Sequence, residues 1–355
     1  FMSGTSGDGV DASIIKSDGK DKVNIEYNNY DPYPLKLSNE IHTIKEKLSN
    51  SSDLIKFLPE IEILEKKLTD FHSEIAIKLI KDYNIDLIGF HGQTIFHNSD
   101  EKISRQIGLG KKLSEATKKK VVYDFRQNDL KNGGEGAPLA PIYHQILFKN
   151  IVKNKKVKLP LTILNLGGIA NITIINEKFE FESRDIGPGN CMIDKWFRLN
   201  SNKNFDDNGD ISKSGKIDKF ILDQSIENYY NFNINKKKSL DTNDFDINFC
   251  RGLSLENGAA TLTEFTSEIL SNKLLNNDIY VCGGGRKNKY LMECLQKKIK
   301  GNLILIDDFD IDGDFIESQA FAFLAIRSDL GLPISFPSTT GCEIPLTGGS
   351  IIKSF

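Results

Sequence analysis

Apolar residues recur every three or four positions between Asp53 and Lys81, and this spacing predicts one amphipathic helix packed on a sheet. The apolar stripe consists of Leu54, Leu58, Ile61, Leu64, Leu68, Phe71, Ile75 and Leu79. His72 lies beside this stripe, where a packing or surface role is expected rather than a catalytic one.

Short apolar runs bounded by glycine, proline or polar residues predict the strands. They cover residues 87–90, 121–123, 161–166, 172–175 and 279–282. A loose alternation of apolar and polar residues predicts a further strand over 23–30. Further helices are predicted over residues 191–199, 253–275, 290–300 and 315–325, and a loop over 200–216. A glycine turn beside a strand occurs in both halves of the chain, which favours two α/β domains of similar build.

The first residues, which read MSGTSGDGVD from Met2, predict a hairpin whose turn can approach a ligand closely. Backbone N–H groups and hydroxyls in such a turn can bind phosphate, and Asp8 at its tip could hold magnesium through water. An ordinary glycine-rich turn would give the same pattern. The candidate residues are Gly4, Thr5, Ser6, Gly7, Asp8, Gly9, Val10 and Asp11.

Two later glycine turns follow buried strands, and the second of them precedes a helix. A strand, a glycine turn and a helix start together offer backbone donors to a phosphate. The spacing fits a dinucleotide motif poorly, and no Walker sequence occurs. The candidate residues in these turns are Gly167, Gly168, Asn171, Gly283, Gly284, Gly285 and Asn288.

Polar residues follow the strand 87–90, at the end where ligands usually bind in α/β proteins. They are His91, Gln93 and Thr94. A loop histidine satisfied by its neighbours is the alternative interpretation.

Arg126 follows the strand 121–123, and its planar guanidinium suits an anionic group such as a carboxylate. An ion pair with Asp124 or Asp129 would explain it equally well. The glycine-rich stretch that follows, residues 133–139, predicts a hinge or a domain boundary.

Asp185 is the strongest candidate for chemistry, because it precedes a turn of Gly187, Pro188 and Gly189 at the start of a helix. A carboxylate in that place is held rigidly near backbone donors. The alternative is that Asp185 only caps the helix. Glu317 is likewise either a helix-dipole acid or a second active-site carboxylate.

The composition excludes several classes of function. The 355 residues are 39% apolar and 27% charged, with a net charge of −3 and both signs dispersed, so neither a nucleic-acid surface nor a membrane surface is expected. The five cysteines are far apart and form no CxxC pair, which favours reduced core residues in a cytoplasmic protein over zinc or disulfides.

Nine motifs occur along the chain in one order, and in this the sequence resembles the anhydro-N-acetylmuramic acid kinases, sugar kinases of the actin-like superfamily. The motifs are MSGTS-x-DG-x-D, HGQT, DFR, GG-x-GAPL, GGIANIT, GPGN, LS-x-x-x-GAATLT, CGGGRKN and E-x-x-x-FA-x-LA. Two departures stand out. Ile186 replaces a family threonine, and only Phe1 precedes the first motif, so the first strand is expected to be clipped.

The resemblance implies two ribonuclease-H-like domains around a central ATP cleft. The first is expected over residues 1–130 and 332–355, and the second over 131–331. The glycine turns would bind ATP, Asp185 would be the general base, and Asp8 and Glu317 would organise Mg²⁺ and water. The residues expected to bind the sugar are His91, Gln93, Thr94, Arg126, Gly187 and Asn190.

The implied reaction opens 1,6-anhydro-N-acetylmuramic acid with water and phosphorylates it, giving N-acetylmuramic acid 6-phosphate and ADP in peptidoglycan recycling. A cytoplasmic homodimer is expected from the family. The basic run 236–238 before Ser239, Leu240 and Asp241 is typical of a solvated surface, although the resemblance leaves a ligand role open. Two alternatives on the same fold are a chaperone-type ATPase and a phosphohydrolase, and the carboxylate beside a sugar pocket favours the kinase.

Overall fold

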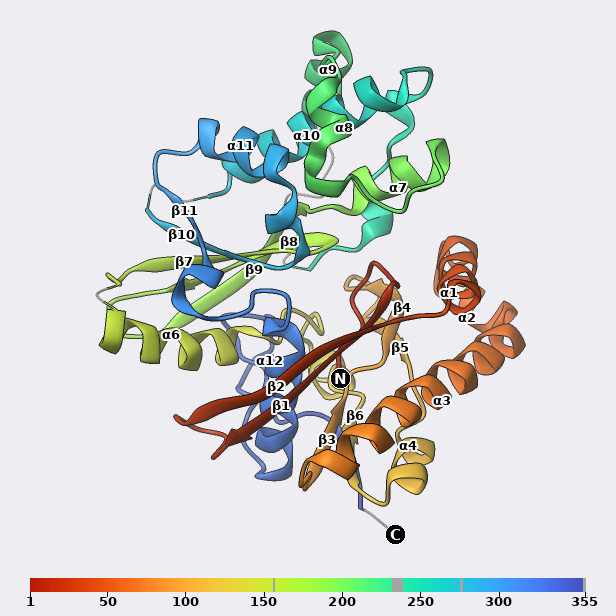
Figure 1. Ribbon diagram of the computed structural model, residues 1–355, viewed down its shortest axis with the longest axis vertical. Coiled ribbons are helices and arrows are strands. Elements are labelled where there is room, and N and C mark those ends of the chain that lie inside the picture. The colour runs from red at the N-terminus through yellow and green to blue at the C-terminus, as the bar shows by residue number, and fades with distance from the viewer. Residues whose placement is uncertain (156, 232–238, 275–276, 354–355) are drawn as a thin grey trace. The chain divides into compact units, whose positions relative to one another are not determined.

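The chain divides into two compact units, the first from Phe1–Asn150 and Phe315–Phe355 and the second from Ile151–Asp314 (Figure 1). The structure is a computed structural model and describes residues 1–355 except 156, 232–238, 275–276 and 354–355. These boundaries differ from the expected ones at 130/131 and 331/332.

Two contacts explain the difference in the boundaries. The glycine-rich stretch 133–139 is held in the first unit, where Glu135 N–H donates to Thr340 O over 2.8 Å. Helix α12 (Ile316–Asp329) packs on the strands β1 (Gly9–Ser17) and β3 (Leu87–Phe90) of the same unit.

The first three residues join two sheets of the first unit into one. Met2 forms an antiparallel bridge to Asp11, and Ser3 forms a parallel bridge to Gln93. His91 N–H also donates to Phe1 O over 3.2 Å. The segment therefore acts as a short strand between β1 and β3.

The strand order of the first unit is β2, β1, residues 1–3, β3, β6 and β12. The strand β1 is antiparallel to both of its neighbours, while residues 1–3, β3 and β6 run parallel. This is the ribonuclease-H-like order, extended by an antiparallel β12. The remaining bounds are β2 (Val23–Pro32), β6 (Lys120–Tyr123), β12 (Ser350–Ile352) and the separate hairpin of β4 (Gln93–Asn98) and β5 (Ile103–Ile107).

The helix expected over 53–81 is wrong in one respect, because the structure has two helices that meet at Phe57. They are α2 (Asp53–Lys56) and α3 (Leu58–Asp82). Pro59 lies in the first turn of α3, where its missing N–H is tolerated but would interrupt a longer helix. His72 is fully buried, as its expected packing role requires. The unit also contains α1 (Leu35–Lys47), α4 (Gly110–Thr117) and α5 (Gln127–Lys131).

The second unit is built on one five-stranded sheet with the order β11, β10, β7, β8 and β9. Its strand β8 is antiparallel to both neighbours, while β10 and β11 run parallel to β7. This is again the ribonuclease-H-like order, so the expected fold class is confirmed. The bounds are β7 (Leu161–Leu166), β8 (Ile169–Ile175), β9 (Phe181–Pro188), β10 (Ile279–Cys282) and β11 (Leu303–Leu305).

Helix α10 (Leu255–Ser271) is the central helix of the second unit and contacts four other helices and β9. Its neighbours are α7 (Cys191–Asn200), α8 (Asp210–Ser214), α9 (Lys219–Asn231) and α11 (Lys289–Lys298). The loop expected over 200–216 is therefore partly wrong, because it contains α8 and the 3₁₀ turn η1 (Asp207–Gly209). The Asp206 carboxylate starts α8 by accepting hydrogen bonds from the N–H groups of Ile211 and Ser212. Other elements are α6 (Pro141–Lys155), which crosses the unit boundary, η3 (Thr242–Asp244), η4 (Asn248–Cys250), η5 (Gly284–Lys287) and η6 (Ile306–Phe309).

All five cysteines are free thiols, and four of them are buried. Within the part of the chain that the structure describes, no helix combines the length and apolar character needed to cross a membrane.

Candidate active-site residues in the two units

The glycine-rich start of the chain forms the predicted hairpin turn between residues 1–3 and β1. Gly7 N–H donates to Gly4 O over 3.1 Å, which closes the turn. Gly7 has a φ of +63°, and a Cβ there would lie 3.1 Å from Ile41, so glycine is favoured. Asp8 is exposed, and its Oδ1 accepts a hydrogen bond from Ser6 Oγ at 2.6 Å. Val10 is fully buried in the core, so only its backbone could meet a ligand.

Helix α1 supports this turn, which the sequence analysis did not anticipate. Ser38 Oγ donates to Gly7 O over 2.7 Å, and Lys45 Nζ donates to Thr5 O over 2.6 Å. Ser38, Ile41 and Lys45 are three and four residues apart, so they share one helix face. The result is a fixed turn with a positive charge beside it.

His91 and Arg126, predicted separately, are direct partners in the first unit. His91 Nδ1 lies 2.8 Å from Gly92 O and must therefore carry the proton. Its Nε2 is then the acceptor for Arg126 Nη2 at 3.0 Å. Burial, and next the charge of Arg126, lower the pKa of His91 well below its usual value, so the ring is neutral. Arg126 Nη1 also donates to Gly136 O over 2.8 Å, which fixes the guanidinium.

Gln93 links the HGQT motif, residues 91–94, to the N-terminal hairpin turn through a hydrogen bond. The side chain is fully buried, and its Nε2 donates to Gly4 O over 2.9 Å. Gln93 Oε1 has no hydrogen-bond partner among the described residues, and a buried acceptor of that kind is suited to a ligand N–H or O–H. Thr94 Oγ1 accepts a hydrogen bond from Gln106 at 3.1 Å, which holds the motif against β5.

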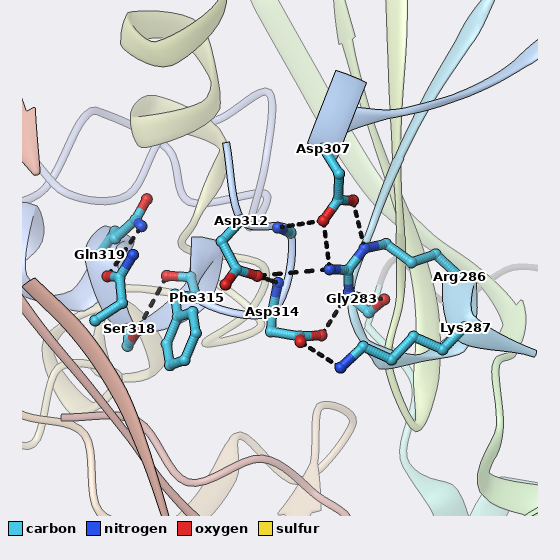
Figure 2. Close-up of polar contacts among 11 residues, drawn as sticks. Gly283, Arg286, Lys287, Asp307, Asp312, Asp314, Phe315, Ser318 and Gln319 are labelled. Atoms are coloured by element: carbon cyan, nitrogen blue, oxygen red, sulfur yellow. Dashed lines mark hydrogen bonds and ion pairs between the residues drawn. The ribbon is translucent and has the colours of Figure 1, made fainter. Parts of the chain in front are cut away.

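Glu317 is half-buried in the first turn of α12. The next residue, Ser318, lies with its Oγ 2.6 Å from Ser13 Oγ on β1, and its Oγ also donates to Phe315 O (Figure 2). Asp11 is on the same face of β1 as Ser13, since side chains alternate along a strand. The start of α12 is therefore packed against the strand that leaves the hairpin.

The described residues contain no group of three or more histidine, cysteine, aspartate or glutamate side chains that could hold a metal ion. Magnesium in kinases is usually bound by one or two carboxylates together with water and phosphate. Asp8 is exposed and Glu317 is half-buried, and each could supply one carboxylate to such a magnesium ion.

In the second unit, the turn at Gly167 and Gly168 lies directly against the turn that starts α7. Gly189 N–H donates to Gly168 O and Asn190 N–H donates to Gly167 O, each over 2.9 Å. A Cβ on Gly189 would lie 2.1 Å from Gly167 O, so the approach requires glycine. Because these two N–H groups are occupied, Asn190 could bind a ligand only through its side chain.

Asp185 is buried on β9 at a β-bulge. Ala170 pairs with Gly187 and the next residue, Asn171, pairs with Asp185, so Ile186 is the extra residue. A bulge redirects neighbouring side chains and often occurs beside an active site. Ile186 is fully buried in the core, which explains how an isoleucine is accommodated where the resembled family has threonine.

The helix-cap interpretation of Asp185 is wrong, because the N-cap of α7 is Asn190 and no side-chain hydrogen bond caps it. Instead Asp185 Oδ2 accepts a hydrogen bond from Leu240 N–H at 2.7 Å. Leu240 follows the basic run 236–238, which lies outside the described residues. The sequence offered only the nearby SLD segment as a signal for this contact.

The glycine turn after β10 is packed against the end of β7. Gly283 has a φ of +82°, and a Cβ there would lie 2.4 Å from Asn165 Oδ1. A Cβ on Gly285 would lie 2.7 Å from Leu166 and 2.9 Å from Asn190 Nδ2, whereas Gly284 faces open space. The predicted turns of the second unit therefore meet at the same end of its sheet.

Asn288 has a structural role within this turn. Its Oδ1 accepts a hydrogen bond from Leu291 N–H at 2.9 Å and so caps α11. The side chain is buried. The predicted nucleotide contact would have to use its remaining amide group.

A family model described as anhydro-N-acetylmuramic acid kinase matches residues 1–354. The chain belongs to this family. It is 46% identical over 370 residues to an anhydro-N-acetylmuramic acid kinase of Pelagibacter ubique, with 100% of this chain and 98% of that protein covered. Proteins of the same name from Zymomonas mobilis and Agrobacterium fabrum are 39% and 35% identical, over 99% and 100% of this chain and 98% of each relative.

A solved structure, the activator of the 2-hydroxyisocaproyl-CoA dehydratase from Clostridium difficile with bound ADPNP, matches at 13% identity. It covers 48% of this chain and 61% of that chain with a TM-score of 0.30, which is too low to bear on the function. The expected class, a phosphotransferase of the anhydro-N-acetylmuramic acid kinase family, is confirmed by the family match and the relatives.

Proposed function

We propose that this chain uses ATP and water to convert 1,6-anhydro-N-acetylmuramic acid into N-acetylmuramic acid 6-phosphate and ADP. The observation that carries the proposal is Asp185, a buried carboxylate fixed by Leu240 N–H beside a β-bulge. A general base must be held in position and remain ionised, and a backbone N–H that donates to one oxygen serves both needs.

Asp185 takes a proton from the water that attacks the anomeric carbon. The bond between that carbon and the bridging oxygen breaks, and the electron pair stays on the oxygen, which is then the 6-oxygen of the opened sugar. This oxygen attacks the γ-phosphorus of ATP, and the bond to the ADP oxygen breaks. The proton on Asp185 is later lost to solvent.

Phosphoryl transfer depends mainly on positioning and on neutralising the charge of the phosphates. The N–H groups and hydroxyls of Gly4–Asp11 are suited to the phosphates, and Lys45 adds a positive charge beside Thr5. Mg²⁺ bound with Asp8 and Glu317 would neutralise the charge that moves between the phosphates. The turns at Gly167 and Gly283 would complete nucleotide binding.

The sugar carries a carboxylate on its lactyl group, and Arg126 is suited to bind it. Neutral His91 accepts a hydrogen bond from Arg126, so it orients the guanidinium without competing for the anion. Gln93 Oε1, a buried acceptor without a partner among the described residues, is suited to a sugar hydroxyl or amide N–H. Thr94, Gly187 and Asn190 complete the proposed sugar-binding set.

The test is ADP release with magnesium and ATP, with and without the anhydro sugar, in water enriched in oxygen-18. The proposal requires sugar-dependent ADP release and one heavy oxygen at the anomeric carbon of the product. ADP release that ignores the sugar would favour the chaperone-type ATPase, and free phosphate without a phosphorylated sugar would favour the phosphohydrolase.

The proposed enzyme acts in the cytoplasm as a homodimer in peptidoglycan recycling. Five free thiols agree with a reducing compartment, and ATP is abundant there. Sedimentation of the purified chain at several concentrations tests the dimer. A single species of about 40 kDa would contradict it, since the chain has a mass of 39.9 kDa.

A further inference from the structure

Arg286 forms an ion-pair network directly after the glycine turn 283–285. Its Nε donates to Asp307 Oδ2 over 2.7 Å and its Nη2 to Asp307 Oδ1 over 2.8 Å, while its Nη1 donates to Asp314 Oδ1 over 2.5 Å. Figure 2 shows Asp312 as a third carboxylate, 3.5 Å from Nη2. The Arg286 side chain is only 5% exposed, so this charge is largely removed from water.

The network holds both backbone groups of Gly283. Arg286 Nη1 donates to Gly283 O over 3.1 Å, and Gly283 N–H donates to Gly313 O over 3.0 Å. Gly313 lies on the guanidinium, since a Cβ there would be 2.7 Å from Arg286 Nε. The segment 307–314 and Arg286 therefore fix Gly283 in its positive φ from two sides.

The pKa shifts in this network keep Arg286 protonated and Asp307 ionised, so the ion pair between them is permanent. Burial alone would lower the pKa of Arg286, but the hydrogen bonds that it donates to Asp307 and Asp314 raise it. The hydrogen bond from Arg286 lowers the pKa of Asp307. Lys287 adds a second ion pair to Asp314.

We propose that Arg286 is a positioning residue for the nucleotide: clamped by Asp307 and Asp314, it holds the turn 283–285 in the shape that binds ATP. This inference rests on the proposed function. A guanidinium is needed because only its planar fork can bind Asp307 through two nitrogens and also reach Asp314 and Gly283 O. A lysine would keep the charge and lose this geometry.

Two variants test the proposal and keep a positive charge at position 286, so Asp307 and Asp314 still face a cation. Arg286→Lys removes the fork, and Gly313→Ala displaces the guanidinium while every charge remains. Each should raise the KM for ATP at least tenfold, with kcat reduced less than threefold and the KM for the sugar changed less than twofold. The control is Lys298→Met, which removes an ion pair to Glu264 and Glu268 at the far end of α11 and should leave the KM for ATP unchanged.

A KM for ATP within twofold of wild type in folded Arg286→Lys would overturn the inference. The inference would also be overturned if the KM for ATP rose equally in Arg286→Lys, Gly313→Ala and Lys298→Met and the rise followed the drop in their melting temperatures. If wild type shows no sugar-dependent turnover, the proposed function fails, and the inference is decided by the Kd of a fluorescent ATP analogue. Tenfold weaker binding in Arg286→Lys then supports it, and absence of binding to wild type overturns it.

Discussion

Asp185→Asn is the most direct test of the proposed chemistry, because the amide has nearly the same shape but cannot accept a proton at neutral pH. Its carboxamide oxygen can still accept the hydrogen bond that Leu240 N–H now donates over 2.7 Å. Replacing a charged acceptor by a neutral one costs about 1 kcal/mol, so the second unit should remain folded.

The expected loss of activity follows from the role of a general base. Such a base contributes about 10²–10⁴-fold to a rate, which corresponds to about 3–5 kcal/mol in the activation free energy. Turnover should therefore fall at least a hundredfold, while the Kd for ATP stays within twofold. A coupled assay of ADP release gives the turnover rate, and isothermal titration calorimetry gives the Kd for ATP.

Asp206 provides a matched control in the same unit. It is a buried carboxylate that accepts hydrogen bonds from Ile211 N–H, Ser212 N–H and Ser212 Oγ, but no role in the reaction is assigned to it. Asp206→Asn should lower the free energy of unfolding by about 2 kcal/mol with little change in kcat. The base assignment would be refuted by Asp185→Asn with a kcat within threefold of wild type, or by equal losses of kcat in both variants.

Three further predictions follow from the first unit. Lys45→Met should lower kcat about tenfold, because Lys45 holds Thr5 O and supplies charge at the turn. Lys47→Met removes an ion pair to Glu60 and a cation–π contact with Phe57 and should leave kcat unchanged; steady-state kinetics compare the two variants. Gly7→Ala should lower the free energy of unfolding by about 1–2 kcal/mol in urea titrations, since alanine is strained at a φ of +63°, and an unchanged value would contradict the observed turn. Burial lowers the pKa of His72 to about 3, so between about pH 3 and pH 6.5 only the unfolded chain binds its proton. The stability that neutral His72 contributes is fully present above pH 6.5 and falls as the pH is lowered toward 3, by about 2 kcal/mol at pH 5. Urea unfolding at pH 7 and pH 5 should show this loss in wild type and less of it in His72→Phe.

Strands whose apolar residues are continuous were predicted well from the sequence. The runs at 87–90, 161–166 and 279–282 match β3, β7 and β10 in both bounds, because such runs leave few alternatives to a buried strand. The motifs also predicted the hairpin turn and the turns around Asp185. For these features, the local pattern carried enough information.

Other elements could not be predicted because their local signals are weak or depend on distant partners. The strand β12 has three residues and is defined by its pairing with β6, more than two hundred residues earlier. The expected helix over 53–81 missed the break before α3, since its apolar spacing continues through Phe57 and outweighed the signal from Pro59. The predicted domain boundaries placed α12 in the second unit, whereas its packing on β1 and β3 places it in the first.

The sequence by itself determined where the glycine turns lie and to which family the chain belongs, because glycine turns and strand-end motifs are local properties of consecutive residues. Only the tertiary structure decided how these segments are held. Leu240 N–H on Asp185, Lys45 on Thr5 and Arg286 between Asp307 and Gly283 join residues that are separated in the sequence. A hydrogen bond acts over about 3 Å, so such partners are chosen only when the folded chain brings them together.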